Sequence, residues 1–270
     1  VRVPPITAND ALTLFVERAE RGHPEFKLTP AKRSRIEAIV AQLDYLPLAI
    51  ELAAARMSML NLEQIESRLA SRFRLLRRRG LGVDDRQGNM YSAIAWSWDL
   101  LEPVERLALA QCAVFHGGFT LVDAEAILDV SAIDADLWLE EVLGSLVDKT
   151  LVRRWATPGG RHRFGLYESI RAFASEKLAD PKTLTDSEGR PLTGPLAREA
   201  LERRHISHFS GWGTTTAIDR LDVHGGPDLY RALEEQIENL EAALDLALTG
   251  GQSRDAAHLV RALCAIYYNR

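Results

Sequence analysis

The sequence predicts a mainly α-helical fold with a single β-hairpin. Two observations predict this fold class. Apolar residues recur at intervals of three and four through most of the chain, which is the spacing of amphipathic helices. Only between residues 151 and 166 does the pattern change to that of strands. The chain has 270 residues, which is too long for one small core, so we expect two or three domains.

The first block, residues 1–79, is predicted to be a bundle of helices. Its clearest apolar face has members at positions i, i+3, i+4 and i+7: Ile36, Ile39, Val40 and Leu43. After a short break, Pro47 is well placed to open the next helix, which is rich in alanine. A further stripe consists of Leu62, Ile65, Leu69 and Phe73. We expect a loop at 80–88, with Gly80 and Gly82, to end the bundle.

The second block, residues 90–179, begins with helices. Thr120 and Asp123 form a variant capping box, which predicts that a helix starts after the Gly-Gly break before them. Another helix is expected over roughly 134–149. Its apolar stripe is the cleanest of this block: Leu139, Val142, Leu143, Leu146 and Val147.

A β-hairpin and a closing helix complete the second block. The segments 151–155 and 162–166 are predicted to be strands, and a Thr-Pro-Gly-Gly turn lies between them. The helix that follows has four apolar positions on one face: Ile170, Phe173, Ala174 and Leu178. Several helices, a hairpin and a closing helix together are typical of a winged-helix domain.

The third block consists of a polar segment and further helices. Residues 180–195 contain three prolines and two glycines, so we expect a linker or an exposed loop. A continuous helix is predicted over 229–248, and a short glycine turn connects it to a last helix. We take 196–270 as the first unit of a tetratricopeptide-like (TPR-like) helical region, and expect it to continue beyond Arg270.

Composition and charge exclude several classes of protein. Apolar residues make up 46% of the chain, and the formal charge of −5 gives no global positive field that would attract nucleic acid or an anionic membrane. No apolar run is long enough for a membrane span and no signal peptide is apparent, so we expect a cytoplasmic protein without a membrane partner. Cys112 and Cys264 are expected to be buried thiols.

No catalytic motif is recognisable. The chain contains no GxxxxGK[ST], GxGxxG, GxSxG or HExxH sequence. Glu202, His205 and His208 share a helical face and could form half of a metal site, but the partner carboxylates would have to come from other helices. We favour an ordinary helix face there, with no metal. The chain alone is therefore not expected to be an enzyme or to hydrolyse ATP.

Charge also argues against DNA binding by the predicted winged helix. The helix that normally enters the DNA groove carries mostly acidic residues: Asp134, Asp136, Glu140, Glu141 and Asp148 against Lys149. The hairpin carries four arginines: Arg153, Arg154, Arg161 and Arg163. A separate basic run is interpreted as a solvated helix end, and the alternative is a site for nucleotide phosphates, RNA or an acidic partner: Arg72, Arg74, Arg77, Arg78 and Arg79.

The stretch LPLAIELAAAR, residues 46–56, resembles a signature of the NB-ARC family of STAND-class signalling ATPases. The resemblance is strongest to large bacterial transcriptional regulators with a central NB-ARC ATPase. Further matching segments follow in the same order: 72–76, 95–101, 114–121, 146–152 and 167–174. The resemblance covers about residues 5–178, and the helical tail fits the TPR-like region that follows in such proteins.

The resemblance implies how the blocks would be used. Residues 1–79 would be the helical lid and 90–179 the winged helix, and both would close over ADP or ATP held by an upstream P-loop domain. The adenine side would be lined by Leu46, Pro47 and Leu48. The phosphate side would lie near Tyr167, Glu168 and Ser169. Two departures bear on this: Tyr45 replaces the family's usual glycine, and Glu168 replaces a histidine that contacts the β-phosphate.

The leading functional hypothesis is therefore the regulatory part of an ADP/ATP signalling switch, with a hinge in the 80–88 loop. Because the chain begins with valine, we expect it to be a fragment whose P-loop domain precedes it. We expect the helical region to bind a protein partner and the whole protein to be capable of self-association. Two alternatives stay open: a scaffold without ATPase function, and a DNA-binding winged helix.

Overall fold

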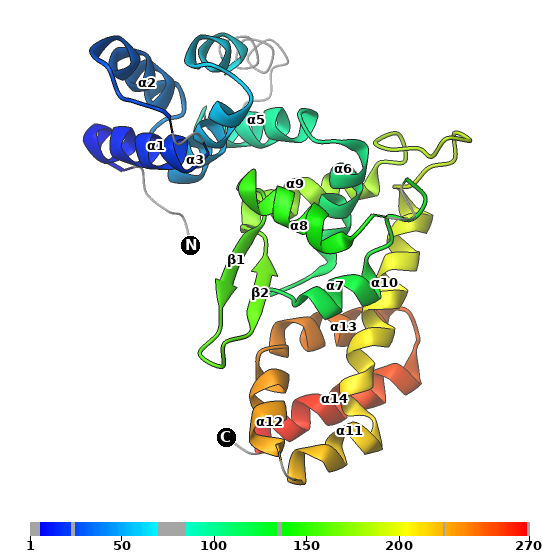
Figure 1. Ribbon diagram of the computed structural model, residues 1–270. Coiled ribbons are helices and arrows are strands. Elements are labelled where there is room, and N and C mark those ends of the chain that lie inside the picture. The colour runs from blue at the N-terminus through cyan, green and yellow to red at the C-terminus, as the bar shows by residue number, and fades with distance from the viewer. Residues whose placement is uncertain (1–5, 23–24, 70–84, 134–136, 224, 269–270) are drawn as a thin grey trace. The chain divides into compact units, whose positions relative to one another are not determined.

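The computed structural model describes residues 6–22, 25–69, 85–133, 137–223 and 225–268 (Figure 1). The chain divides into two compact units. The first contains Val1–Glu102 and Gly144–Leu151, and the second contains Pro103–Leu143 and Val152–Arg270. The described residues are mainly helical, and the sheet they form has two strands. The predicted fold class is confirmed.

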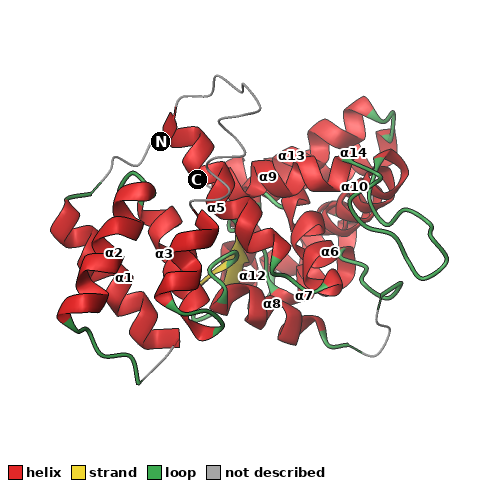
Figure 2. Cartoon of the chain, turned by 90° about the horizontal axis from the view of Figure 1, so that it is seen from above, coloured by secondary structure: helices red, strands yellow, loops and turns green. Residues whose placement is uncertain are grey.

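The helices of the first unit pack around α1 and α3. They are α1 (Ala8–Gly22), α2 (Pro30–Gln42), α3 (Pro47–Ala55), the short η1 (Arg56–Ser58), a helix over 62–69, and α5 (Asp85–Asp99). Helix α1 contacts both α2 and α3, and these three helices can be followed in Figure 2. Helix α5 also contacts α3. The predicted apolar face of α2 is buried, including Ile36 and Ile39. An ion pair between Arg18 and Glu51 links α1 to α3.

Local signals place the helix starts of this unit. Thr29 caps α2 by accepting a hydrogen bond from the backbone of Lys32, and Pro30 is the first helical residue. Pro47 has the same role in α3. The predicted loop at 80–88 is too long, because α5 already begins at Asp85. The basic run at 72–79, Phe73 and the hinge glycines lie outside the described residues.

The winged helix is built from elements in the predicted order. They are α6 (Pro103–Gln111), η2 (Cys112–Val114), α7 (Leu121–Ile127), α8 (Leu139–Asp148), β1 (Arg153–Ala156), β2 (His162–Gly165) and α9 (Glu168–Ala179). The strands are antiparallel, with Arg154 opposite Phe164, and an isolated bridge joins Phe119 to Phe164. Both strands lie within about two residues of their predicted positions. The apolar face of α9 is buried as predicted.

Two expectations about α8 and its surroundings need correction. The helix begins at Leu139 and not near residue 134, because a turn occupies 131–133 and Trp138 provides the first carbonyls. Asp134 and Asp136 are outside the described residues. Within α8 as observed, the exposed acidic side chains are therefore fewer than expected, namely Glu140, Glu141 and Asp148.

The polar segment after α9 is a folded loop. Thr185 and Pro191 form an isolated bridge, and the Thr193 hydroxyl donates to the carbonyl of Asp180 at 2.7 Å. Leu184 and Thr193 are buried. The loop thus leads directly into the next helix, where Pro195 is the first residue.

The C-terminal helices belong to the same unit as the wing. They are α10 (Pro195–Ser210), η3 (Gly211–Gly213), α11 (Thr215–Asp219), η4 (Arg220–Asp222), α12 (Gly226–Glu234), α13 (Ile237–Thr249) and α14 (Ser253–Tyr268). Helices α13 and α14 form the predicted hairpin around a glycine turn, and α10 packs on both. A backbone carbonyl of α14, that of His258, lies where a Cβ at Gly213 would stand, so only glycine fits there.

The prediction of one continuous helix over 229–248 is wrong, because the structure has two helices there, α12 and α13. It is interrupted at 235–236, where Gln236 has φ −99° and ψ 3° and its amide bonds to the carbonyl of Leu233, three residues back. The amphipathic period survives the interruption, so the sequence pattern alone does not reveal it. The side chains of Glu235 and Gln236 turn toward the wing.

Both cysteines were predicted to be buried, which is confirmed for Cys112 and wrong for Cys264. Cys112 is buried, and burial raises the pKa of its thiol. Cys264 is exposed, because α14 turns Leu263 and Ile266 inward and leaves Cys264 on its outer face. Among the described helices, none combines the length and the apolar character that a bilayer crossing requires.

Candidate functional site

The predicted adenine-side residues lie at the start of α3. Leu46 is the N-cap residue in extended conformation, and its carbonyl accepts from Ile50 at 3.0 Å. Leu46, Pro47 and Leu48 are all half-buried. They offer an apolar edge with no charged group of their own, which suits the face of a planar heterocycle such as adenine.

The turn before Leu46 has a left-handed backbone. Asp44 and Tyr45 have φ of 51° and 56°. This conformation lets the amide of Tyr45 bond to the carbonyl of Val40 and terminates α2, and the Tyr45 carbonyl accepts from Ile6 at 3.1 Å. For a residue with a Cβ the left-handed region costs roughly 1–2 kcal/mol. The position that carries Tyr45 is therefore one where glycine would be free of this strain.

The predicted phosphate-side residues lie at the start of α9. Tyr167 is the N-cap residue, and Glu168 and Ser169 are exposed. Glu168 accepts two hydrogen bonds from Arg171, at 2.7 and 3.0 Å, and these bonds lower the pKa of Glu168. An arginine thus accompanies the carboxylate that would otherwise repel a phosphate. Leu46–Leu48 belong to the first unit and Tyr167–Ser169 to the second.

Three of the four hairpin arginines, Arg153, Arg161 and Arg163, contact other groups of their own unit. The Arg153 guanidinium stacks over Trp155, with 4.7 Å between the guanidinium carbon and the ring centroid. Arg161 donates from Nε and Nη2 to the two carboxylate oxygens of Glu235, at 3.3 and 3.0 Å. Its Nη1 also donates to the carbonyl of Asp228. The side chain of Arg154 is exposed.

A buried polar network continues from these pairs into the unit. We call it the wing seam, and it consists of Asp123, Arg161, Arg163, His208, Glu235, Gln236 and Asn239. Arg163 is 2% exposed and donates to the carbonyl of Gly118 at 2.7 Å and to Gln236 at 3.3 Å. The wing is therefore held against the corner between α12 and α13.

Asn239 connects the seam to the loop before α7. Its amide nitrogen donates to the carbonyl of Gly118 at 2.7 Å, and its oxygen accepts from the backbone of His116 at 2.8 Å. Gly118 has φ 111°, and a Cβ there would lie 2.5 Å from Trp155. The Gly-Gly break that the sequence marks as a helix boundary is thus a close-contact point between wing and helices.

Asp123 has two roles. One carboxylate oxygen accepts from Thr120 and completes the predicted capping box, which is confirmed. The same oxygen accepts from Gln236, and the other lies 2.7 Å from Nε2 of His208. Burial alone would raise the pKa of Asp123, but the hydrogen bonds from His208 and Thr120 outweigh it and lower that pKa.

The three residues considered for a metal have separate surroundings. Glu202 pairs with Arg198, and His208 pairs with Asp123. His205 is fully buried between Phe115 and Phe209, and burial lowers its pKa to about 3, although the nearby Asn239 amide raises it slightly. In the described part of the chain, no cluster of three potential metal ligands occurs.

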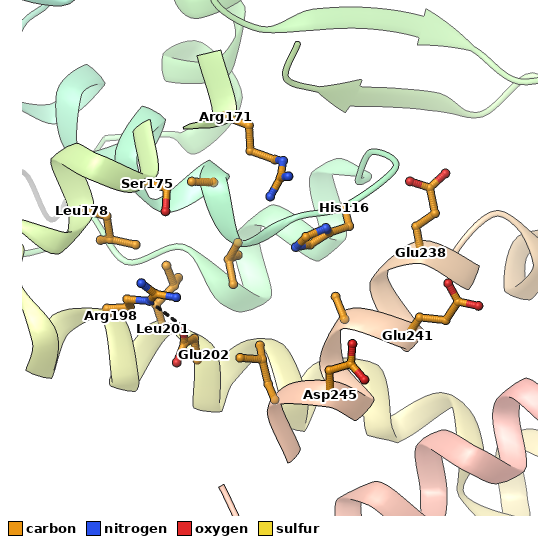
Figure 3. A pocket seen from close by; sticks show the side chains of 14 residues that line it. His116, Arg171, Ser175, Leu178, Arg198, Leu201, Glu202, Glu238, Glu241 and Asp245 are labelled. Atoms are coloured by element: carbon orange, nitrogen blue, oxygen red, sulfur yellow. Dashed lines mark hydrogen bonds and ion pairs between the residues drawn. The ribbon is translucent and has the colours of Figure 1, made fainter. Parts of the chain in front are cut away.

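A cavity of about 570 Å³ lies between the winged helix and α10 and α13 (Figure 3). Arg171 and His116 point into it from the winged helix, and Glu238, Glu241 and Asp245 line the α13 side. The arginines of its wall, Arg171 and Arg198, each pair with a neighbouring glutamate. The lining is thus acidic on balance, which does not suit a phosphate group.

Part of the chain is similar to a known family of domains, and the whole chain is similar to larger bacterial proteins. Residues 101–179 match the family described as winged helix-turn-helix domain. Over all 270 residues the chain is 31% identical to "Putative HTH-type transcriptional regulator Rv0890c" of Mycobacterium tuberculosis and to the protein with the corresponding name, Mb0914c, of Mycobacterium bovis. It is 38% identical over 183 residues, 66% of its length, to "Uncharacterized protein Rv0894" of Mycobacterium tuberculosis, of which it covers 46%.

The chain spans 28% of the length of the two regulators. The winged helix-turn-helix match agrees with the elements described above from α6 to α9. The names of these relatives describe regulators and an uncharacterised protein, and none describes an enzyme.

Sequence reasoning found some of these residues and missed others. It found Thr120 and Asp123 as a cap, because both partners of a capping box lie within one turn. It missed Gln236 and Asn239, which are distant in the chain from the atoms they bind. A polar residue on an otherwise apolar helix face, as Asn239 is, was the signal that could have revealed the seam.

Proposed function

We propose that this chain is the regulatory part of a nucleotide-dependent transcriptional regulator. The bundle of residues 1–79 would be a lid and the winged helix of 90–179 a mobile domain, and both would close over ADP or ATP. The nucleotide would be held by a P-loop domain upstream of this chain. The helical region at 196–270 would bind a protein partner, and nucleotide exchange would release the protein for self-association.

The turn before α3 is the observation that carries this proposal. In the NB-ARC signature a glycine precedes Leu-Pro-Leu, and the left-handed backbone at Tyr45 is the conformation that such a glycine serves. The half-buried apolar edge of Leu46, Pro47 and Leu48 suits adenine. The winged helix-turn-helix match and the names of the relatives support a role in transcriptional regulation.

The test uses the complete gene product that contains this chain. Its reading frame is first examined for GxxxxGK[ST] upstream of Val1, and ADP and ATP binding is then measured by calorimetry. We expect Pro47→Ala to weaken ADP binding about tenfold, or about 1.4 kcal/mol. Pro30→Ala is the matched control, since Pro30 also opens a helix but lies outside the signature. Equal effects of both substitutions, or no nucleotide binding at all, would contradict the proposal.

A second candidate function is DNA binding by the winged helix. The family match and the regulator names favour it directly. The acidic side chains of α8 and the engaged arginines of the wing oppose it. A mobility-shift assay with a duplex at several salt concentrations discriminates the two functions. Binding that weakens steeply with salt would support the DNA-binding function for this segment.

A further inference from the structure

Arg161 and Arg163, the two arginines of strand β2 and its turn, differ in how deeply they are held in the wing seam. The side chain of Arg163 is 3% exposed, bonds to Gly118 and Gln236, and has an ion pair with Glu235 at 3.6 Å. The side chain of Arg161 is 34% exposed, and its ion-pair partner is Glu235, which is 22% exposed. Arg163 is therefore part of the interior, whereas Arg161 is a surface cation covered by one carboxylate.

Glu235 owes its position to the interruption between α12 and α13. The amide of Glu235 still makes the helical bond to the carbonyl of Arg231, four residues back, but the amide of Gln236 bonds to the carbonyl of Leu233, three residues back, and the helix ends there. With the chain turned in this way, the side chain of Glu235 contacts Arg161 and the side chain of Gln236 contacts Arg163. The carboxylate of Glu235 meets the Arg161 guanidinium with two oxygens, which is also how a phosphate binds arginine.

We propose that Glu235 masks part of the wing by occupying Arg161, a cation that would otherwise join the exposed Arg154 in contacting the phosphate backbone of double-stranded DNA. The pair with Arg161 is exchangeable, because a partly exposed ion pair contributes little stability and competes with other anions; Glu235 also lies 3.6 Å from the buried Arg163, which has further bonds of its own. Movement of the α12–α13 corner would expose Arg161, whereas Arg163 would stay bonded to Gly118. This inference rests on the second candidate function, DNA binding by the winged helix.

The test measures binding of a labelled random-sequence DNA duplex to the full 270-residue chain by fluorescence anisotropy. Glu235→Ala is expected to tighten binding by about three- to tenfold. It should also steepen the slope of log K against log salt by about one, as one more phosphate contact would. Glu238→Ala is the matched control, because it removes the same charge from an exposed position of α13 that does not contact the hairpin arginines. It should give a smaller gain and an unchanged slope.

A double variant tests whether Arg161 carries the effect. Glu235→Ala combined with Arg161→Ala should return both affinity and salt slope to the values of the unmodified chain. Circular dichroism and thermal melting establish that each variant is folded. If Glu235→Ala does not fold, Glu235→Gln is used, which keeps hydrogen bonding, removes the charge and should give a smaller gain in the same direction.

The outcomes distinguish two hypotheses: that Glu235 masks Arg161, and that the winged helix binds DNA. If the unmodified chain already binds duplex DNA, loses affinity on Arg161→Ala and gains none on Glu235→Ala, DNA binding stands and the mask is wrong. Equal gains for Glu235→Ala and Glu238→Ala, or a gain that persists in the double variant, also overturn the mask. Absence of DNA binding in every folded variant overturns both the mask and the DNA-binding function.

Discussion

The start of α3 and the wing seam differ in how far apart their residues lie in the chain. At the start of α3, the turn, the proline and the cap are consecutive residues, and their hydrogen bonds stay within the two adjoining helices except for the one that Tyr45 accepts from Ile6. In the wing seam, Asp123 meets His208 across 85 positions and Gln236 across 113. The first feature is set by local backbone preference, and the second by packing of distant segments.

This difference has an energetic consequence. The turn at Tyr45 carries backbone strain, but no buried charge depends on it. The wing seam contains buried Asp123 and Arg163, and a buried polar group that loses a partner destabilises the fold strongly. We therefore expect substitutions in the seam to have larger effects than substitutions at the turn.

The largest effect is expected from protonation of His205. Its pKa is lowered to about 3 in the folded chain, so below its ordinary value of 6.5 the unfolded chain binds a proton that the folded chain does not. Stability of the second unit should then fall as the pH drops from 6.5 toward 3, by up to about 1.4 kcal/mol per pH unit. Urea unfolding at several pH values measures this. His205→Phe should flatten the dependence, and an unchanged slope would contradict the assignment.

The next effect is expected at Asn239. Asn239→Ala removes the acceptor of the His116 amide and one of the two donors to the Gly118 carbonyl, and we expect a loss of about 3 kcal/mol in the free energy of unfolding. The comparison is Asn61→Ala, which removes a local bond to the amide of Gln64 and should cost about 1 kcal/mol. If urea unfolding gives equal losses in the free energy of unfolding for the two variants, the expected difference between long-range and local contacts is wrong.

The same contrast explains how much of the molecule could be predicted from the sequence. The capping box at Thr120, the proline that opens α3 and the turn of the hairpin were predictable, because each depends on neighbouring residues. The interruption at 235–236 was not, because the apolar period continues through it and the side chains at that point contact the distant wing. The exposure of Cys264 depends on how α14 packs, and helical spacing alone did not determine it.

The candidate sites follow the same division. Leu46, Pro47 and Leu48 were named from one contiguous motif, and the structure adds the reason why glycine suits the position before them. For Glu168, the sequence shows only that a carboxylate replaces the family's histidine, whereas the ion pair with Arg171 became visible with the side-chain geometry. Neither set of residues is a tested nucleotide site, and both stay predictions.

A smaller effect on the free energy of unfolding is expected at Tyr45, where glycine should be more stabilising than alanine. Glycine normally destabilises a fold relative to alanine, but the left-handed backbone at this position should reverse the order. We expect Tyr45→Gly to be more stable than Tyr45→Ala by about 1 kcal/mol. At Leu46, where φ is −80°, alanine should be the more stable substitution. The same order at both positions in thermal unfolding would show that the turn is not left-handed in solution.

The smallest effect on stability is expected at Glu168. Its ion pair with Arg171 is exposed and spans one helical turn, so Glu168→Gln should change the free energy of unfolding by less than about 0.5 kcal/mol at neutral pH. The pair lowers the pKa of Glu168, so its small contribution exists above the ordinary carboxyl pKa and disappears as the pH falls through the lowered value.

The same substitution could have a much larger effect on ligand binding than on stability. In the complete gene product, Glu168→Gln removes a negative charge and releases Arg171, so ADP should bind several-fold more tightly if this helix start faces the phosphates. Calorimetry with ADP measures the change, and Glu176→Gln on the same helix is the control for charge alone. Equal affinities for both variants would mean that α9 does not contact the nucleotide. The lid at α3 would then be the part of this chain left to recognise it.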